Sequence, residues 1–88
     1  MIKYLIAFVI FFSQFSNAEI VKSIKVIGND RISIQTIKAY GDIKLNNNYE
    51  KLDVDKVLKK LYETDFFEEI NISLQNGILN IIVKEYPS

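Results

Sequence analysis

The stretch EINISLQNGILNIIVK, residues 69–84, decides the fold, because two runs of alternating character surround an Asn-Gly pair. Asn76-Gly77 is the strongest short signal for a two-residue hairpin turn, since a type I′ turn needs a positive φ at both central positions. Such a turn fixes the register of the two strands. The pairing then places six apolar side chains on one face of the hairpin: Ile70 with Val83, Ile72 with Ile81, and Leu74 with Leu79.

The opposite face of this hairpin receives the polar residues of both strands. Its pairs are Ser73 with Asn80, Asn71 with Ile82, and Glu69 with Lys84. A shift of the register by one residue would carry the apolar set to the polar face. Turn chemistry and pattern therefore agree, and they predict strands over Glu68–Leu74 and Ile78–Val83.

A further strand is predicted upstream, over Ile20–Ile27. Ile24 and Val26 share one face, and Ile20 lies on the same side. The turn residues Gly28-Asn29-Asp30 end this strand.

A short helix is predicted next, because Ser33 can cap the exposed N–H groups of a helix that starts there. Ile34 and Ile37 are expected on its core side, and Gly41 is a natural end for it. The following segment, Asp42–Tyr49, contains three Asn in a row and is expected to be a solvated loop rather than a ligand site.

A second, better-marked helix follows. Asp53 is placed to cap it, and Leu52 can pack on Val57 across the cap. One apolar stripe has helical spacing: Val54, Val57, Leu58, Leu61 and Tyr62. Charged residues cover the other side: Asp55, Lys56, Lys59, Lys60 and Glu63.

The order of the strands follows from topology. Two helices return the chain to the end of the sheet where the first strand finished, so the third strand runs parallel to the first. Ile78–Val83 is almost continuously apolar, which suits a central strand, whereas Glu68–Leu74 alternates, which suits an edge. The sequence therefore predicts a two-layer α+β domain with a mixed three-stranded sheet, order first-third-second, covered on one face by two helices.

Residues 1–18 have the pattern of a secretory signal peptide and not of the fold. An unbroken apolar run, Tyr4–Phe12, follows a basic start, and the small residues Ser16 and Ala18 precede the expected cleavage between Ala18 and Glu19. A membrane anchor is the alternative, but spanning a bilayer takes about 20 apolar residues, more than this run supplies. The domain is thus expected to occupy residues 19–88.

Composition argues against catalysis and against nucleic acid as a partner. The chain has no His and no Cys, which removes the commonest bases, thiol nucleophiles and metal ligands, so no cofactor or metal is expected. Glu68 and Glu69 are neighbours on a strand, where their side chains should point to opposite faces. Eleven basic residues balance eleven acidic ones, unlike the surface of a nucleic-acid-binding domain.

Three segments resemble motifs of the POTRA family. Ile24–Ser33 (IKVIGNDRIS) resembles the opening I-x-V-x-G-N-x-R-I, and Leu61–Phe67 (LYETDFF) is similar to L-x-x-T-G-x-F. Leu79–Pro87 matches the closing L-x-I-x-V-x-E-x-P. The resemblance covers nearly all of residues 19–88 and is greatest to the first POTRA domain of an outer-membrane protein assembly factor. Asp65 stands where the family usually has Gly, and Asp tolerates the left-handed conformation better than most residues.

The resemblance implies a periplasmic module, attached to the outer membrane within a longer protein. Its implied partners are unfolded outer-membrane proteins, accessory assembly lipoproteins, and the further POTRA domains and membrane barrel that would follow, so the chain is expected to be truncated. The residues supply a physical route, since an edge strand offers unpaired backbone groups to any extended peptide. The predicted binding residues are Ile70, Asn71, Ile72, Ser73 and Leu74.

Other interpretations stay open. The strand could be merely an edge, protected by Glu68 and Glu69, and the domain could instead dock partners through the helix that carries Lys56, Lys59 and Lys60. The same fold is implied for transporters of two-partner secretion, translocation factors of the TamA type and division proteins of the FtsQ type. The last keep an uncleaved anchor behind a cytoplasmic tail.

Overall fold

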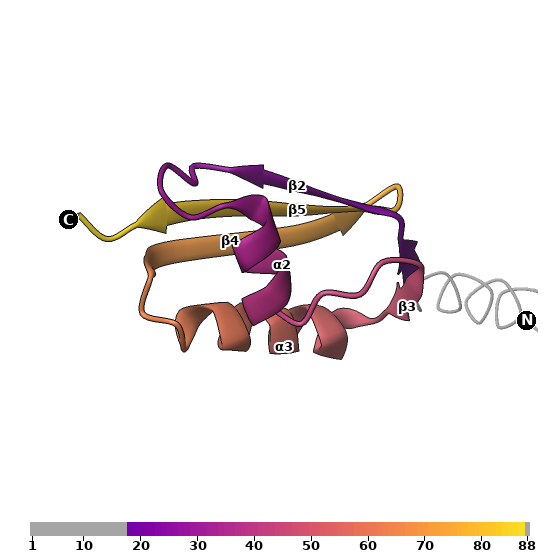
Figure 1. Ribbon diagram of the computed structural model, residues 1–88. Helices are drawn as coiled ribbons and strands as arrows, with labels where there is room; N and C mark the ends of the chain where they lie inside the picture. Colours follow the sequence, from indigo (N-terminus) through magenta and orange to yellow (C-terminus); the bar gives the residue numbers. More distant parts are fainter. Residues whose placement is uncertain (1–17, 88) are drawn as a thin grey trace, which may run out of the picture.

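The computed structural model describes residues 18–87, so the predicted signal peptide lies outside the described residues apart from Ala18. Three strands form the main sheet: β2 (Ser23–Ile27), β4 (Phe67–Gln75) and β5 (Ile78–Glu85). Figure 1 shows two helices on one side of this sheet, α2 across it and α3 along β4. They span Ile34–Tyr40 and Lys51–Tyr62. No helix of this part of the chain is long and apolar enough to cross a membrane.

The sheet has the predicted order, β2-β5-β4, with β2 parallel to β5 and β4 antiparallel to it. The hairpin register is also confirmed, since Ile72 pairs with Ile81 and Leu74 with Leu79. Asn76 has φ of 54° and Gly77 has φ of 76°, as a type I′ turn requires. The turn therefore sorts the side chains of both strands to the two faces as the sequence predicts.

The core lies between the sheet and the two helices. Strands β4 and β5 contribute the buried residues Ile70, Leu79, Ile81 and Val83, while Ile24, Val26, Ile72 and Leu74 are partly buried against them. The other buried residues come from both helices (Ile37, Val57 and Leu61), from the start of β4 (Phe67) and from segments outside the main sheet (Val21, Ile43 and Tyr49). The predicted α+β class and the predicted core face are thus confirmed.

The first strand differs from the prediction of a single strand over Ile20–Ile27. The chain forms β1 (Glu19–Val21) and β2 with a break at Lys22, and the two segments join different sheets. The N–H groups of Lys22 and Ser23 both donate to the carbonyl oxygen of Gly77, at 2.7 and 3.2 Å. This contact with the hairpin turn redirects the chain, so Val21 is fully buried and Ile20 is 49% exposed.

The predicted loop Asp42–Tyr49 contains a strand. Its last three residues form β3 (Asn47–Tyr49), which pairs antiparallel with β1 in a separate two-stranded sheet. Asn46 adopts φ of 64° and donates its N–H to the Val21 carbonyl oxygen at 2.6 Å. Asn accepts this left-handed conformation more readily than most residues, which allows the turn into β3.

Helix α2 confirms its predicted cap but only half of its predicted core face. The Ser33 hydroxyl accepts a hydrogen bond from the Thr36 N–H, and the helix ends at Gly41. Ile37 is buried, whereas Ile34 is 43% exposed, so the expectation that Ile34 faces the core is wrong. Ile37 is the one residue of Ile34–Tyr40 that is fully buried.

Helix α3 begins earlier than predicted, at Lys51. Glu50 is the N-cap residue, and Asp53 lies three residues further on, where its carboxylate accepts the Glu50 N–H at 2.9 Å. Leu52 is 70% exposed, so the predicted packing of Leu52 on Val57 does not form. The apolar stripe is confirmed for four of its five residues, with Val57 and Leu61 buried and Val54 and Leu58 half-buried. The fifth, Tyr62, is 42% exposed.

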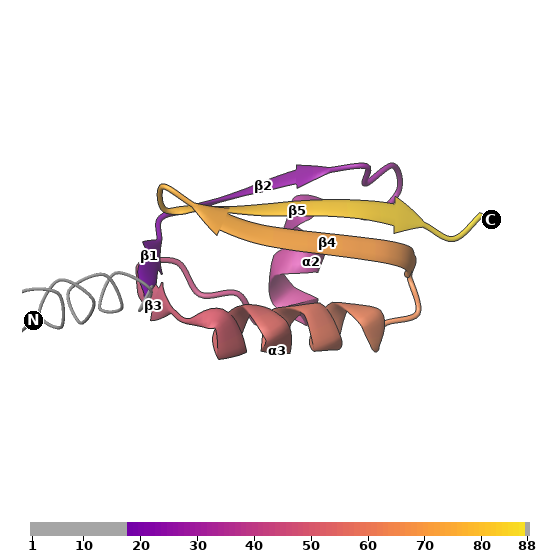
Figure 2. The ribbon, with the colours of Figure 1, turned by 180° about the vertical axis from the view of Figure 1, so that it is seen from behind.

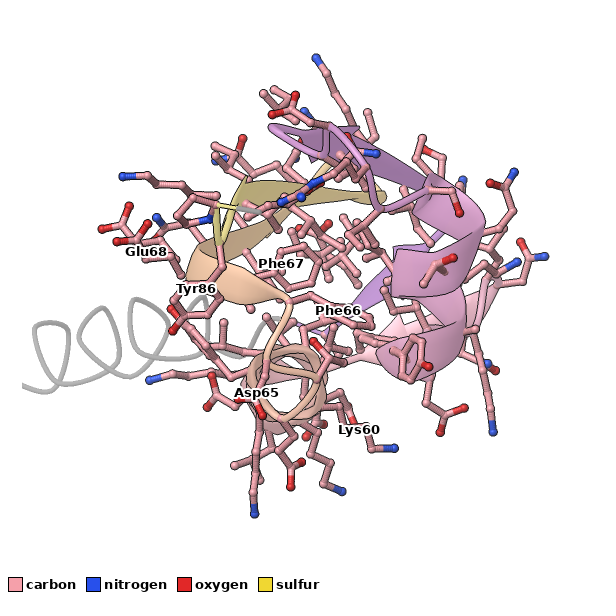
Figure 3. The ribbon with its side chains drawn as sticks, turned by 60° about the vertical axis from the view of Figure 1, so that its left-hand side comes forward. Lys60, Asp65, Phe66, Phe67, Glu68 and Tyr86 are labelled. Carbon is pink, nitrogen blue, oxygen red and sulfur yellow. The ribbon has the colours of Figure 1, made fainter. Side chains whose placement is uncertain are left out.

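The start of β4 carries a β-bulge that the sequence pattern does not predict. Phe67 pairs with Glu85 and Glu69 with Lys84, which leaves Glu68 as an extra residue. Figure 3 shows Phe67 directed into the interior and Glu68 directed away from it. With the bulge, Glu68 and Glu69 are both exposed, so neither side chain lies in the core.

Candidate functional site

The predicted binding residues lie on the outer edge of the main sheet. Strand β4 pairs with β5 on one side only, and Figure 2 shows its other side turned toward α3. Ile70, Ile72 and Leu74 pack their side chains on the core, and Asn71 and Ser73 are exposed on the helix-free face. This segment therefore offers a partner mainly its backbone N–H and C=O groups.

The direction of each backbone N–H in β4 follows from the hairpin register. Gln75 and Ile78 close the two-residue turn as a hydrogen-bonded pair, and hydrogen-bonded pairs then alternate along the strands. The N–H groups of Asn71 and Ser73 thus point into the hairpin, and those of Ile72 and Leu74 point outward. Within residues 18–87, no group outside the hairpin bonds to the Ile72 or Leu74 N–H.

The outward N–H of Ile70 does have a partner, the hydroxyl oxygen of Tyr62, at 3.0 Å. Tyr62 is the last residue of α3 and is 42% exposed. The helical spacing places Tyr62 in the apolar stripe and does not predict this contact. The only signal in the sequence is its position at the end of the stripe, where a phenol can reach beyond the buried surface.

A hollow of about 310 Å³ lies beside the far end of this edge. Leu74 and Val54 supply its apolar wall. The remaining lining residues come from β1, β3 and the start of α3: Glu19, Tyr49, Glu50 and Lys51. The hollow therefore lies beside Leu74, and its volume is large enough for one side chain of a partner.

The alternative docking surface, the lysine-bearing side of α3, borders a larger hollow of about 460 Å³. Lys56 and Lys60 line it, together with Lys44 from the segment before β3, whereas Lys59 does not. Lys60 pairs with the Asp42 carboxylate at 3.2 Å. The structure thus brings together two of the three lysines considered for docking.

The motif residues at the other end of the domain, Asn29, Arg31 and Glu85, have structural roles. The Asn29 amide donates to the Ile32 carbonyl oxygen at 2.8 Å, which closes the turn after β2. The Glu85 carboxylate accepts the N–H groups of Arg31 and Ile32 at 2.9 and 3.1 Å. These contacts tie the turn to the end of β5.

The environment of Glu85 changes the pKa of its carboxyl group. Burial of this side chain, which is 6% exposed, raises the pKa. The hydrogen bonds from the Ile32 and Arg31 N–H groups and from the Arg31 guanidinium lower the pKa by more, so that it lies below the usual value.

Within residues 18–87, no three His, Cys, Asp or Glu side chains are grouped so that they could hold a metal ion.

Solved structures with the same arrangement are known. The N-terminal domain of Omp85 from Thermosynechococcus elongatus matches 81% of this chain over 32% of its own, with a TM-score of 0.71 at 13% identity. POTRA1-2 of the periplasmic domain of Omp85 from Anabaena matches 82% over 50%, with a TM-score of 0.64 at 11% identity. The fold is that of a POTRA domain.

Among curated proteins, the sequence is similar to the outer membrane protein assembly factor BamA. The protein of Neorickettsia risticii is 27% identical over 78 residues, 89% of this chain and 11% of its own length. That of Neisseria meningitidis serogroup B is 28% identical over 68 residues, 77% of this chain and 8% of its own. The chain therefore spans a small part of these relatives, and it resembles the N-terminal POTRA domain of BamA. No family model matches the sequence.

Proposed function

We propose that this domain is a periplasmic module of an outer-membrane protein assembly factor, and that the edge of β4 binds extended segments of unfolded outer-membrane proteins. The similarity to BamA and the POTRA fold support the first part. The observation that carries the second part is the pair of outward N–H groups at Ile72 and Leu74, which have no partner among the described residues.

Strand addition at this edge suits such a partner for a physical reason. Unfolded membrane β-strands are extended and differ in sequence, and backbone hydrogen bonds recognise them whatever their side chains are. The hollow beside Leu74 and Val54 would accept one side chain of the added strand. Affinity is expected to be weak, because a short peptide must be ordered on binding.

The remaining partners in this proposal are accessory assembly lipoproteins, neighbouring POTRA domains and a membrane barrel. They rest on the similarity to BamA alone. The lysine-bearing side of α3 is the surface through which the domain would dock if the β4 edge proved inert.

The test is an NMR titration of the ¹⁵N-labelled protein with a synthetic peptide of about ten residues, the length of a membrane β-strand. Wild type should show shift changes at the amides of Ile72 and Leu74. Leu74→Pro should abolish binding, because proline removes the outward donor and hinders a neighbouring strand.

Leu74→Ala is the matched control, since it loses the same packing but keeps the N–H, and it should still bind. Ser73→Ala should bind like wild type, because its N–H points into the hairpin. If the shift changes instead gathered around Lys56, Lys59 and Lys60, the domain would dock partners through α3 and the β4 proposal would be wrong.

A further inference from the structure

The edge of β4 is divided by Tyr62. Three outward N–H groups follow one another at alternate residues of this strand, at Ile70, Ile72 and Leu74. The first of them donates to the Tyr62 hydroxyl oxygen at 3.0 Å. The outward donors available to a partner are therefore those of Ile72 and Leu74.

The position of Tyr62 is fixed by its neighbours. Its carbonyl oxygen accepts the Asp65 N–H at 3.2 Å in the turn that ends α3, and the preceding residue, Leu61, is fully buried. Ile70 is likewise held, because the residue is 5% exposed within the core. Donor and acceptor thus both belong to packed elements, so the contact is part of the fold.

The edge beyond Tyr62 is irregular. Glu68 is the extra residue of the bulge, and its carboxylate lies 3.5 Å from the Lys84 ammonium. A bulge and exposed charges are the usual means by which a protein prevents pairing at an edge strand. From Glu68 to Ile70 the edge is therefore closed to a neighbouring strand, and from Ile72 to Leu74 it is regular and open.

We propose that Tyr62 is a specificity-determining residue that ends the strand-binding edge: by occupying the Ile70 N–H, it limits an added strand to the donors of Ile72 and Leu74. This inference rests on the proposed function. It defines the ligand more narrowly, as an extended segment that needs only a few residues of backbone pairing and that lies over the half of β4 nearer the hairpin turn.

The experiment compares wild type with Tyr62→Phe, which keeps the ring and removes the acceptor. In the free proteins, hydrogen exchange of the Ile70 amide should be faster in Tyr62→Phe. In titrations with the same ten-residue strand peptide, wild type should show shift changes at Ile72 and Leu74 but not at Ile70. In Tyr62→Phe the changes should extend to Ile70, with binding about two- to tenfold tighter, the effect of one added hydrogen bond.

Tyr40→Phe is the matched control, because Tyr40 is 54% exposed and packs on Phe66 away from the edge. It should behave like wild type in both measurements. In wild type, shift changes at Ile70 as large as those at Ile72 would overturn the role of Tyr62. Weaker binding of the peptide by Tyr62→Phe would do the same. Neither result would contradict the proposed binding at the β4 edge. A peptide that shifts no β4 amide in either protein would overturn the proposed function and this inference together.

Discussion

Glu85 and Arg31 stand 54 residues apart in sequence and meet at the end of the domain where β5 leaves the sheet. The Arg31 Nε lies 3.3 Å from one carboxylate oxygen of Glu85, and the Arg31 N–H donates to the other at 2.9 Å. A second guanidinium nitrogen of Arg31 donates to the Tyr86 carbonyl oxygen at 2.6 Å. The turn after β2 is thereby attached to the last strand.

This contact predicts a dependence of stability on pH. The folded-state pKa of Glu85 is lowered, so its contribution to the free energy of unfolding is present above the unfolded-state pKa, about 4.3, and is lost as the pH falls through the folded-state value. Urea denaturation from neutral pH to about pH 3 should show this loss in wild type. Glu85→Gln should be less stable at neutral pH and should lose less stability on acidification.

Glu68→Gln is the control for the pH prediction, because the Glu68 carboxylate makes a surface ion pair with Lys84 and is 44% exposed. Exposed ion pairs contribute little to the free energy of unfolding, so the stability of this variant should depend on pH as that of wild type does. An equally steep decline in Glu85→Gln would show that other groups cause the acid instability.

Gly28 is predicted to be irreplaceable for steric reasons. It has φ of 93°, and a Cβ atom there would lie 2.0 Å from the Val83 carbonyl oxygen, an overlap that requires the backbone to shift. The strained φ alone costs about 1–3 kcal/mol, and the overlap adds to it. Gly41→Ala, at φ of −76°, should cost much less. Thermal denaturation of Gly28→Ala and Gly41→Ala tests this, and similar melting temperatures would contradict it.

Two adjacent isoleucines on β5 test which face of the sheet is buried. Ile81 is fully buried, and Ile82 is 51% exposed on the helix-free face. Ile81→Ala should lower the free energy of unfolding by about 2–5 kcal/mol, whereas Ile82→Ala, the same chemical change, should lower it by well under 1 kcal/mol, or roughly the effect of an ordinary surface substitution. Chemical denaturation measures both, and a larger effect at Ile82 would mean that the two faces are exchanged.

The break at Lys22 can be tested in the same way. Val21 is fully buried, and Ile20 is 49% exposed. Val21→Ala should therefore cost about 1–3 kcal/mol through lost burial and a residual cavity. Ile20→Ala removes more atoms and should nevertheless cost less. A larger cost for Ile20→Ala than for Val21→Ala would instead support the single strand over Ile20–Ile27 that the sequence predicts.

Cleavage between Ala18 and Glu19 is the last prediction. The cut would leave β1 intact, and the Glu19 carboxylate, which accepts the Gly77 N–H at 3.2 Å, would stay in the domain. Mass spectrometry of the exported protein should find Glu19 at the N-terminus. A product that still began at Met1, or one that began beyond Val21, would contradict this site.

The hairpin could be predicted because local turn chemistry and strand pattern act on the same residues. Asn76-Gly77 fixes the register, and the alternation of both strands has one solution in that register. The sheet order followed from the near-continuous apolar character of β5. Asp65, which stands where the family usually has Gly, adopts φ of 60°, as its tolerance of the left-handed conformation allows.

The features that escaped prediction depend on contacts between distant segments. The break at Lys22 is caused by the carbonyl oxygen of Gly77, and β3 exists because it pairs with β1. The bulge at Glu68 and the bond from Ile70 to Tyr62 likewise involve neighbouring elements rather than local pattern. The periodicity of a single sequence contains no information about such partners. It therefore predicts the edge strand but not the bulge or the hydrogen bond to Tyr62 at its beginning.

The parallel pairing of β2 with β5 also has a mechanical consequence. The described chain enters at the β1 end of the domain and leaves at the opposite end, where β5 finishes (Figure 1). A tension applied between these ends would pull β2 and β5 in opposite directions along their common axis. The five paired positions from Ser23 to Ile27 would then be loaded in shear. Their hydrogen bonds would bear the force together instead of breaking one after another.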